Sequence, residues 1–110
     1  MPIDWARVRE LRNEIGAQDF AEVAELFLDE VASAVSALGS DPAEGSIASG
    51  LHFIKGSALN LGFAGLADAC RRGESLASQG NANSVDIGGV QALFQAEFDE
   101  FNEGLESLSD

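Results

Sequence analysis

Apolar residues recur along most of this chain at intervals of three and four, which is the spacing of one face of an α-helix. In the central segment the intervals are four, three, four and three over Ile47, Leu51, Ile54, Ala58 and Leu61. Valine and isoleucine do not alternate with polar residues over the length of a strand, and both prolines lie outside the periodic segments. The pattern therefore predicts an all-α chain.

Capping and stop signals divide this pattern into five predicted helices. The strongest start is Asp41-Pro42-Ala43-Glu44, which has an acidic cap, proline at the first position and glutamate at the third. Asp4 and Asp19 are the predicted caps of the first two helices, and Asp86 or Ser84 is the predicted cap of the last. The predicted helices span residues 5–15, 20–38, 42–61, 64–79 and 87–107, with glycine stops at positions 16, 39 and 62.

Four long amphipathic helices joined by short loops are expected to pack as an antiparallel up-down-up-down four-helix bundle. We expect the short first helix to cover one end of this bundle. A chain of 110 residues is long enough for one modest core, so residues 1–110 are predicted to form a single domain.

The second predicted helix carries a wide apolar face, which suits contact with two neighbours in a bundle. Its main stripe consists of Phe20, Ala24, Phe27, Val31, Val35 and Leu38, and a second set adds Val23, Leu26 and Leu28. The stripe of the last helix consists of Ile87, Val90, Phe94, Phe98, Phe101, Leu105 and Leu108. Cys70 falls in the stripe of the fourth helix, so we expect it to be a small buried hydrophobe.

The charge and composition of the chain exclude several classes of partner. Its 19 acidic and 6 basic residues give a net charge of −13, which argues against nucleic acid and anionic membranes because both require a positive surface. No apolar run approaches the ~18 residues of a membrane span, and charged residues follow soon after Met1. We therefore expect no membrane segment, no signal peptide and a cytoplasmic location. One cysteine and one histidine form no disulfide or zinc site by themselves, and we expect no metal or cofactor.

One stretch of the third predicted helix carries the only histidine and the only lysine of the chain, His52 and Lys55. A separation of three residues places both side chains on one helix face, about 5–6 Å apart at Cβ. At ~100° per residue, His52 points about 140° away from the apolar stripe, so we expect an exposed imidazole. Gly56 lies one turn beyond His52, where glycine costs about 1 kcal/mol relative to alanine and contributes nothing to the core. We interpret Gly56 as leaving room for another molecule.

A solitary exposed imidazole has few chemical roles. In its neutral form it is a nucleophile near physiological pH. No serine, cysteine or second base stands at a spacing that would pair with His52, and no phosphate-binding glycine loop or kinase signature is present. The remaining role is that of a phosphoryl acceptor and donor, with Lys55 offsetting charge on the phosphoryl oxygens. Most solitary surface histidines have no such role, and periodicity alone leaves the two interpretations balanced.

A resemblance to a known family favours the phosphoryl carrier. The run His52-Phe53-Ile54-Lys55-Gly56-Ser57-Ala58-Leu59-Asn60-Leu61-Gly62 resembles the signature of histidine-containing phosphotransfer (HPt) domains. That signature is His-x-x-Lys-Gly, two small residues, two variable residues, an apolar residue and glycine, and every element is present. The predicted helix order and the chain length are also similar to this family. The resemblance implies that His52 accepts the phosphoryl group, that Lys55 assists it and that Gly56 gives access.

The resemblance also implies partners and further site residues. Members pass phosphoryl groups to and from the aspartate of response-regulator receiver domains and operate with hybrid histidine kinases; the Mg²⁺ required belongs to the receiver. Some members place a glutamine 22 residues after the histidine to orient the imidazole. Here that position is Glu74, a carboxylate that can accept a hydrogen bond from the ring N–H but cannot donate one to a phosphoryl oxygen. We expect Glu74 to pair with Arg71, one turn away. The candidate docking surface consists of Ser49, Phe53, Leu59, Arg71, Glu74 and residues of the second helix. Free-standing members are often monomers, so we expect a monomer.

Three other functions remain open at this stage. The first alternative is an adaptor that binds a receiver or kinase without being phosphorylated. An adaptor has no need for His52, Lys55 and Gly56 together, which weighs against this alternative. A second alternative is the phosphoacceptor module of a larger chemotaxis-type histidine kinase, for which the donor is the kinase's own ATP-binding domain. An enzyme that modifies a substrate is disfavoured, because no second catalytic group is placed. The expected function is a phosphoryl carrier without its own ATP-binding or kinase site.

Overall fold

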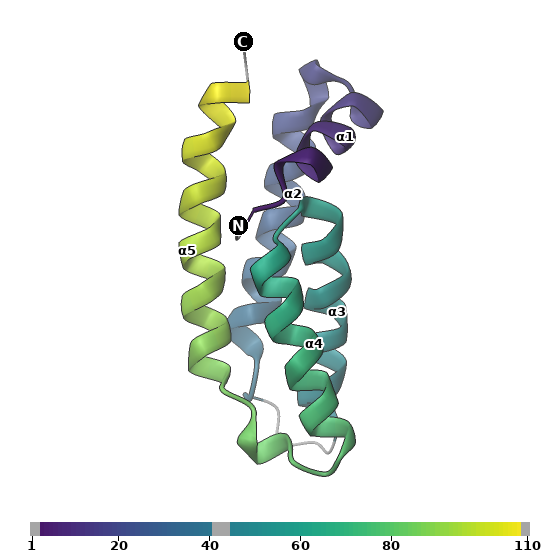
Figure 1. Cartoon of the computed structure of the whole chain (residues 1–110), viewed down its shortest axis with the longest axis vertical. Coiled ribbons are helices and arrows are strands. Elements are labelled where there is room, and N and C mark those ends of the chain that lie inside the picture. The colour runs from purple at the N-terminus through teal and green to yellow at the C-terminus, as the bar shows by residue number, and fades with distance from the viewer. Residues whose placement is uncertain (1–2, 41–44, 109–110) are drawn as a thin grey trace.

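The computed structural model describes residues 3–40 and 45–108, and the regular elements within these ranges are all helices. They are α1 (Trp5–Ile15), α2 (Ala17–Ala37), α3 (Ser46–Leu61), α4 (Ala64–Ser78), the 3₁₀ turn η1 (Ala82–Ser84) and α5 (Ile87–Leu108). The predicted all-α class is confirmed. Figure 1 shows the four longer helices along the long axis of the molecule, with α1 at the end where α3 turns into α4. None of the helices in the described ranges has the length and apolarity needed to cross a membrane.

The start of α2 differs from the predicted start at residue 20. Gly16 adopts a φ of 101°, which ends α1 and lets the chain begin α2 at once with Ala17. Asp19, the predicted N-cap, therefore lies inside the first turn of α2. Its carboxylate is still placed favourably there, because the N-terminal end of a helix carries partial positive charge. The cap predicted for α1 is correct, since the Asp4 carboxylate accepts a hydrogen bond from the Arg7 backbone N–H.

The start of α3 also differs from the predicted start at residue 42. Gly45 has a left-handed φ of 85°, and α3 begins at Ser46. The predicted start signal at residues 41–44 lies outside the described residues. The end of α3 is as predicted, because Gly62 has a left-handed φ of 82°. The cap of α5 is Asp86, whose carboxylate accepts a 2.9 Å hydrogen bond from the Gly89 backbone N–H.

The apolar stripe of α3 fixes the orientation of this helix. Leu51, Ile54, Ala58 and Leu61 are buried, and Ile47 is partly buried against the same core. Gly50 faces α2 so closely that an added Cβ would lie 2.9 Å from Leu38 Cδ2. The predicted stripe is therefore confirmed, and the opposite face of α3 points outward.

The second apolar set predicted for α2 is only partly correct. Leu28 is buried, but the Leu26 side chain is 61% exposed. Two residues separated by two positions point about 200° apart on a helix, so Leu26 and Leu28 do not face one core together. Leu26 is instead an exposed apolar residue on a helix that packs against α3.

The N-terminal segment is attached to the turn between α3 and α4. The Asp4 backbone N–H donates a 2.7 Å hydrogen bond to the Gly62 carbonyl, and Ile3 forms an isolated bridge with Phe63. Trp5 stacks on Phe101 of α5 with ring centroids 6.1 Å apart. These contacts fix α1 over the end of α3 and α4, beside the adjoining turns of α2 (Figure 1).

A buried carboxyl group interrupts the apolar stripe of α5. Glu97 is 1% exposed, and its Oε1 accepts a 3.1 Å hydrogen bond from the Leu66 backbone N–H in the first turn of α4. Burial raises the pKa of Glu97 to about 7, the Leu66 hydrogen bond opposes that rise, and nearby Glu100 adds to it. Gly65 leaves the space that this carboxyl occupies, because a Cβ there would overlap Glu97 Oε2. Glu97 thus caps α4 from another helix, a contact that the sequence analysis missed.

Candidate functional site

The outward face of α3 carries the residues that the sequence singled out. The His52 side chain is 73% exposed, as predicted from its position opposite the buried stripe. Ser49, Phe53 and Leu59 are also exposed. Phe53 and Leu59 are large apolar side chains, so the surface of this helix offers apolar contact area as well as the imidazole.

Glu74 of α4 lies between the two candidate phosphotransfer residues of α3. Its Oε2 is 3.2 Å from His52 Nδ1, and its Oε1 is 2.8 Å from Lys55 Nζ. One carboxylate therefore contacts both the imidazole and the ammonium group. Because Glu74 is on the next helix, packing of α4 against α3 sets the rotation of the imidazole and the position of the lysine.

The protonation state of Glu74 determines which ring nitrogen of His52 is free. The Lys55 ammonium lowers the pKa of Glu74, the hydrogen bond from His52 lowers it further, and burial opposes both effects. Glu74 is thus ionised at neutral pH, and an ionised carboxylate only accepts hydrogen bonds. Nδ1 of a neutral His52 must then carry the proton in this contact, and Nε2 keeps its lone pair.

Gly56 leaves the surface next to His52 open. It is exposed, and a Cβ built on it would meet no atom within 4 Å. Packing within the chain therefore does not require glycine here, in contrast to Gly50 and Gly65. This geometry agrees with the interpretation that the missing side chain makes space for another molecule.

Arg71 does not take the partner that the sequence analysis expected. Its guanidinium contacts Asp68, one turn earlier on α4, at 2.5 Å. Arg71 lowers the pKa of Asp68, and Arg72 contributes to the same shift from 3.4 Å. The predicted Arg71–Glu74 pair is therefore wrong. Lys55 contacts Glu74 instead, and an acidic residue three positions before Arg71 is within easy reach on the same helix.

The other potential nucleophile of the chain is not accessible. Cys70 is buried, as predicted, and burial together with the nearby Glu74 charge raises the pKa of its thiol to about 11. A buried thiol with a raised pKa is unreactive at neutral pH. In the part of the chain that the structure describes, no three or more His, Cys, Asp or Glu side chains gather in an arrangement that would hold a metal ion.

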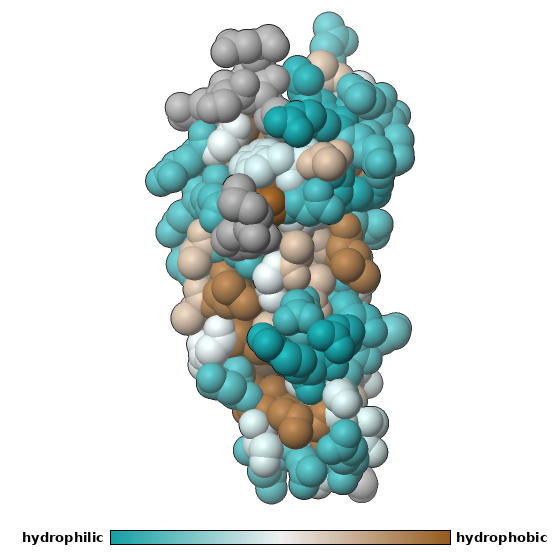
Figure 2. Space-filling view, viewed as in Figure 1, coloured by the Kyte–Doolittle hydropathy of each residue, from teal (hydrophilic) through white to brown (hydrophobic). Residues whose placement is uncertain are grey.

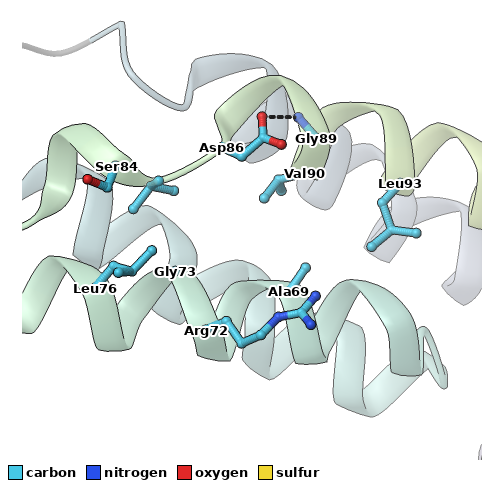
Figure 3. A pocket seen from close by; sticks show the side chains of 10 residues that line it. Ala69, Arg72, Gly73, Leu76, Ser84, Asp86, Gly89, Val90 and Leu93 are labelled. Atoms are coloured by element: carbon cyan, nitrogen blue, oxygen red, sulfur yellow. Dashed lines mark hydrogen bonds between the residues drawn. The ribbon is translucent and has the colours of Figure 1, made fainter.

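A cavity of about 410 Å³ between α4 and α5 lies away from these residues. Figure 3 shows Arg72, Gly73 and Leu76 of α4 on one side and Val90 and Leu93 of α5 on the other. Figure 2 shows hydrophobic side chains in this seam, with strongly hydrophilic ones over α4 beside them. His52, Lys55, Gly56 and Glu74 do not line the cavity. The candidate chemistry is therefore on the open surface of α3, where a second macromolecule can reach the imidazole.

The contact between Lys55 and Glu74 is the site feature that the sequence analysis did not identify. The spacing of His52 and Lys55 was readable because both lie on one helix. Glu74 contacts both residues because α4 packs against α3. The only feature of the sequence that indicated a position near His52 was its separation of 22 residues from His52.

Comparison with known proteins gives one match. The sequence matches the family described as Hpt domain over residues 22–109, which is most of the chain. This range includes α3 and α4 with all the candidate site residues, but it does not include α1. Neither a curated protein nor a solved structure matches the chain significantly.

Proposed function

Because the chain belongs to the Hpt domain family, whose members carry phosphoryl groups in two-component signalling and are not kinases, we propose that it is a phosphorelay intermediate with His52 as its phosphoacceptor. The observation that carries the proposal is the contact of His52 Nδ1 with the Glu74 carboxylate, which leaves Nε2 as an exposed nucleophile. The proposed partners are receiver domains of response regulators and a hybrid histidine kinase, and the proposed location is the cytoplasm.

The transfer step needs no separate base on this chain. Nε2 of His52 attacks the phosphorus of an aspartyl phosphate on a receiver domain, the new N–P bond forms, and the P–O bond to the aspartate breaks. The aspartate leaves as a carboxylate, and the reverse reaction returns the phosphoryl group. The imidazole ring becomes positively charged while Nδ1 keeps its proton, and the Glu74 carboxylate stabilises that charge. Glu74 is thus a positioning residue that acts through the imidazole.

Lys55 and Gly56 have separate roles in this proposal. Lys55 has three N–H donors and a flexible stem, so it can keep contact with Glu74 while donating to a phosphoryl oxygen. Its charge offsets the charge of the phosphoryl group during transfer. Gly56 keeps the surface beside the imidazole low, which allows the walls of a receiver active site to approach.

The docking surface is proposed to surround His52. Phe53 and Leu59 provide exposed apolar area, and Ser49 adds a small polar group. Arg71 is exposed at the edge of α4, where its charge is partly offset by Asp68. Receiver contact with Leu26 of α2 would account for an exposed leucine on a helix that packs against α3.

We further propose that the four longer helices form an antiparallel up-down-up-down bundle within one domain, and that α1 is an additional N-terminal element. Short connections between α3 and α4 and between α4 and α5 support opposite directions for successive helices. The match to the family begins at residue 22, after α1, which supports treating α1 as additional.

Phosphoryl transfer from a radiolabelled phospho-receiver tests the proposal. The wild-type chain should gain the label, and the His52→Gln variant should gain none. The Lys55→Ala variant should be labelled roughly tenfold more slowly, because one charge-assisted contact is worth about 1.5–3 kcal/mol and is partly screened at a surface. A Cys70→Ala variant is the matched control and should be labelled at the wild-type rate.

Other outcomes would favour the remaining functions. If receivers bind the chain with native affinity but never label it, an adaptor replaces the carrier. If only the ATP-binding domain of a kinase labels His52, the chain is a phosphoacceptor module of such a kinase. A label that persists in the His52→Gln variant would refute the assignment of the acceptor.

A further inference from the structure

The basic residues of the chain lie in three of the five α-helices within residues 3–40 and 45–108. Arg7, Arg9 and Arg12 are in α1, Lys55 is in α3, and Arg71 and Arg72 are in α4. The remaining two helices, α2 and α5, contain ten acidic residues and neither lysine nor arginine. Because α2 and α5 lie side by side (Figure 1), the face that these two helices form is acidic, without a contribution from the buried Glu97.

An open groove runs between these two acidic helices. Its volume is about 330 Å³. The floor is apolar and is made by Ala24 and Leu28 of α2 and by Phe98 and Phe101 of α5. Two carboxylates of α2, Glu25 and Asp29, are exposed at its rim. A groove with an apolar floor and a rim of one charge sign specifies both the shape and the charge of what it binds.

We propose that the α2–α5 groove is a docking site for a basic amphipathic helix of a partner protein. The apolar side chains of such a helix, spaced at i, i+3 or i+4, would enter the groove, and flanking lysines or arginines would face Glu25 and Asp29. The inference goes beyond phosphoryl transfer and does not depend on it. The groove residues belong to α2 and α5, whereas His52, Lys55 and Glu74 belong to α3 and α4. A partner in the groove would therefore leave the imidazole accessible.

Charge and groove size favour this occupant over three others. A second copy of the chain would bring its own acidic α2–α5 side against the first, and like charges oppose that approach. An anionic lipid surface is repelled for the same reason. A small neutral ligand would leave the rim carboxylates without a role, and the groove is near the lower limit of about 300 Å³ for ligand pockets.

A designed peptide tests the groove with the full chain. The probe is an amidated, fluorescein-labelled helix of about 18 residues, long enough to be helical, with leucines on one face and lysines and alanines elsewhere. A peptide with the same residues in scrambled order is its control. The ordered peptide should bind at least about tenfold more tightly by fluorescence anisotropy, and its affinity should fall when salt is raised because the rim charges are exposed. In NMR spectra of the labelled chain, the amide chemical-shift changes caused by the ordered peptide should map to α2 and α5.

Two sets of variants separate groove binding from general attraction to an acidic protein. The double variant Glu25→Lys/Asp29→Lys should lower the affinity by about tenfold or more. The matched control Glu22→Lys/Glu30→Lys makes the same charge change on the same helix outside the groove and should lower it less than about threefold. Ala21→Trp, an exposed position at the groove, should also abolish binding by filling the space.

Three results would overturn the proposal. One is equal binding of the ordered and scrambled peptides. Another is an equal loss of affinity in the two double variants, which would show only non-specific charge attraction. The third is a stable dimer of the wild-type chain that Ala21→Trp dissociates, which would make the groove an interface between copies. Labelling of His52 by a phospho-receiver, measured in parallel, reports on phosphoryl transfer independently of all three.

Discussion

Two glutamates, Glu74 of α4 and Glu97 of α5, have pKa values shifted in opposite directions because their surroundings differ. Glu74 lies near the surface, and its pKa is lowered mainly by the Lys55 ammonium and also by His52. Glu97 lies among apolar side chains, and burial raises its pKa to about 7. The first carboxylate stays charged and joins two functional side chains, whereas the second exchanges a proton near neutral pH and joins two helices.

The comparison shows that the site and its support use the same residue type in different ways. The Glu74 carboxylate accepts from Nδ1–H of His52 because it is ionised at neutral pH, and the Lys55 ammonium stabilises that ionised form further. A buried carboxyl group can hold a backbone N–H of α4 even when it is neutral, because its carbonyl oxygen still accepts the bond. Variants of the two glutamates, and of the glycines beside them, should therefore change different properties.

The largest expected effect is on stability at Glu97. We expect Glu97→Ala to lower the free energy of unfolding by about 2–4 kcal/mol near pH 5.5, because it leaves the buried Leu66 N–H without an acceptor and opens a cavity. Glu74→Ala should change it by less than about 1 kcal/mol, since the lost contacts are near the surface. Urea unfolding of both variants measures the difference. An equal loss of unfolding free energy in the two variants would show that Glu74 and Glu97 contribute to stability in the same way, which would contradict this account.

The next effect is the pH dependence that Glu97 introduces. Its folded-state pKa of about 7 lies above the ordinary value of 4.5, so the folded state binds the proton more strongly. The corresponding stability is complete below about pH 4.5 and is lost as pH rises through about 7, with a limiting slope of about 1.4 kcal/mol per pH unit.

Glu97→Gln isolates this contribution, because glutamine keeps the acceptor but does not titrate. The difference in unfolding free energy between the wild type and Glu97→Gln should shift by about 2 kcal/mol between pH 5 and pH 8, in favour of the variant at high pH. Glu74 does not interfere, because its lowered pKa adds stability that is lost only as pH falls below the ordinary value of 4.5. A pH-independent difference would contradict the assignment.

Glu74 should matter more for transfer than for stability. We expect Glu74→Ala to slow phosphoryl transfer to His52 by about tenfold, because the ring loses the partner that fixes its tautomer and stabilises its charge. Glu74→Gln should be less affected, since the amide oxygen still accepts from Nδ1–H. Labelling by a phospho-receiver, quenched at successive times over a range of pH, measures the rate of transfer to both variants. Wild-type rates in both would remove Glu74 from the mechanism.

The smallest expected effect comes from a matched pair of glycines. Gly56→Ala should raise the unfolding free energy by about 0.5–1 kcal/mol, because alanine is the better helix former and its Cβ meets open space. Gly65→Ala should lower it, because its Cβ would overlap the Glu97 carboxyl. Transfer to His52 should slow only in Gly56→Ala. Thermal melts and labelling rates of the two variants provide the test, and the same sign of stability change in both would contradict this account.

The periodic pattern was enough to predict the helices and the outward direction of His52, because both follow from the geometry of a single helix. It failed where two segments meet. Gly16 ends α1 and directly precedes α2, so the predicted start of α2 was three residues late. The pairing of Arg71 with Glu74 was wrong because Lys55 of α3 contacts Glu74, and Arg71 contacts Asp68 instead. Glu97 lies within the apolar stripe of α5 between Phe94 and Phe101, but its capping of α4 depends on the Leu66 backbone N–H of that other helix. Such tertiary contacts are not encoded in local spacing.

The most direct test of the central claim is the state of the His52 ring after phosphorylation. Long-range proton–nitrogen NMR spectra of the ¹⁵N-labelled chain, recorded before and after transfer from a phospho-receiver, report the protonation and substitution of each ring nitrogen. The structure predicts a proton on Nδ1 beside Glu74 in both states and a phosphoryl group on Nε2 after transfer. A phosphoryl group on Nδ1, on another residue or on no residue of the chain would contradict the account.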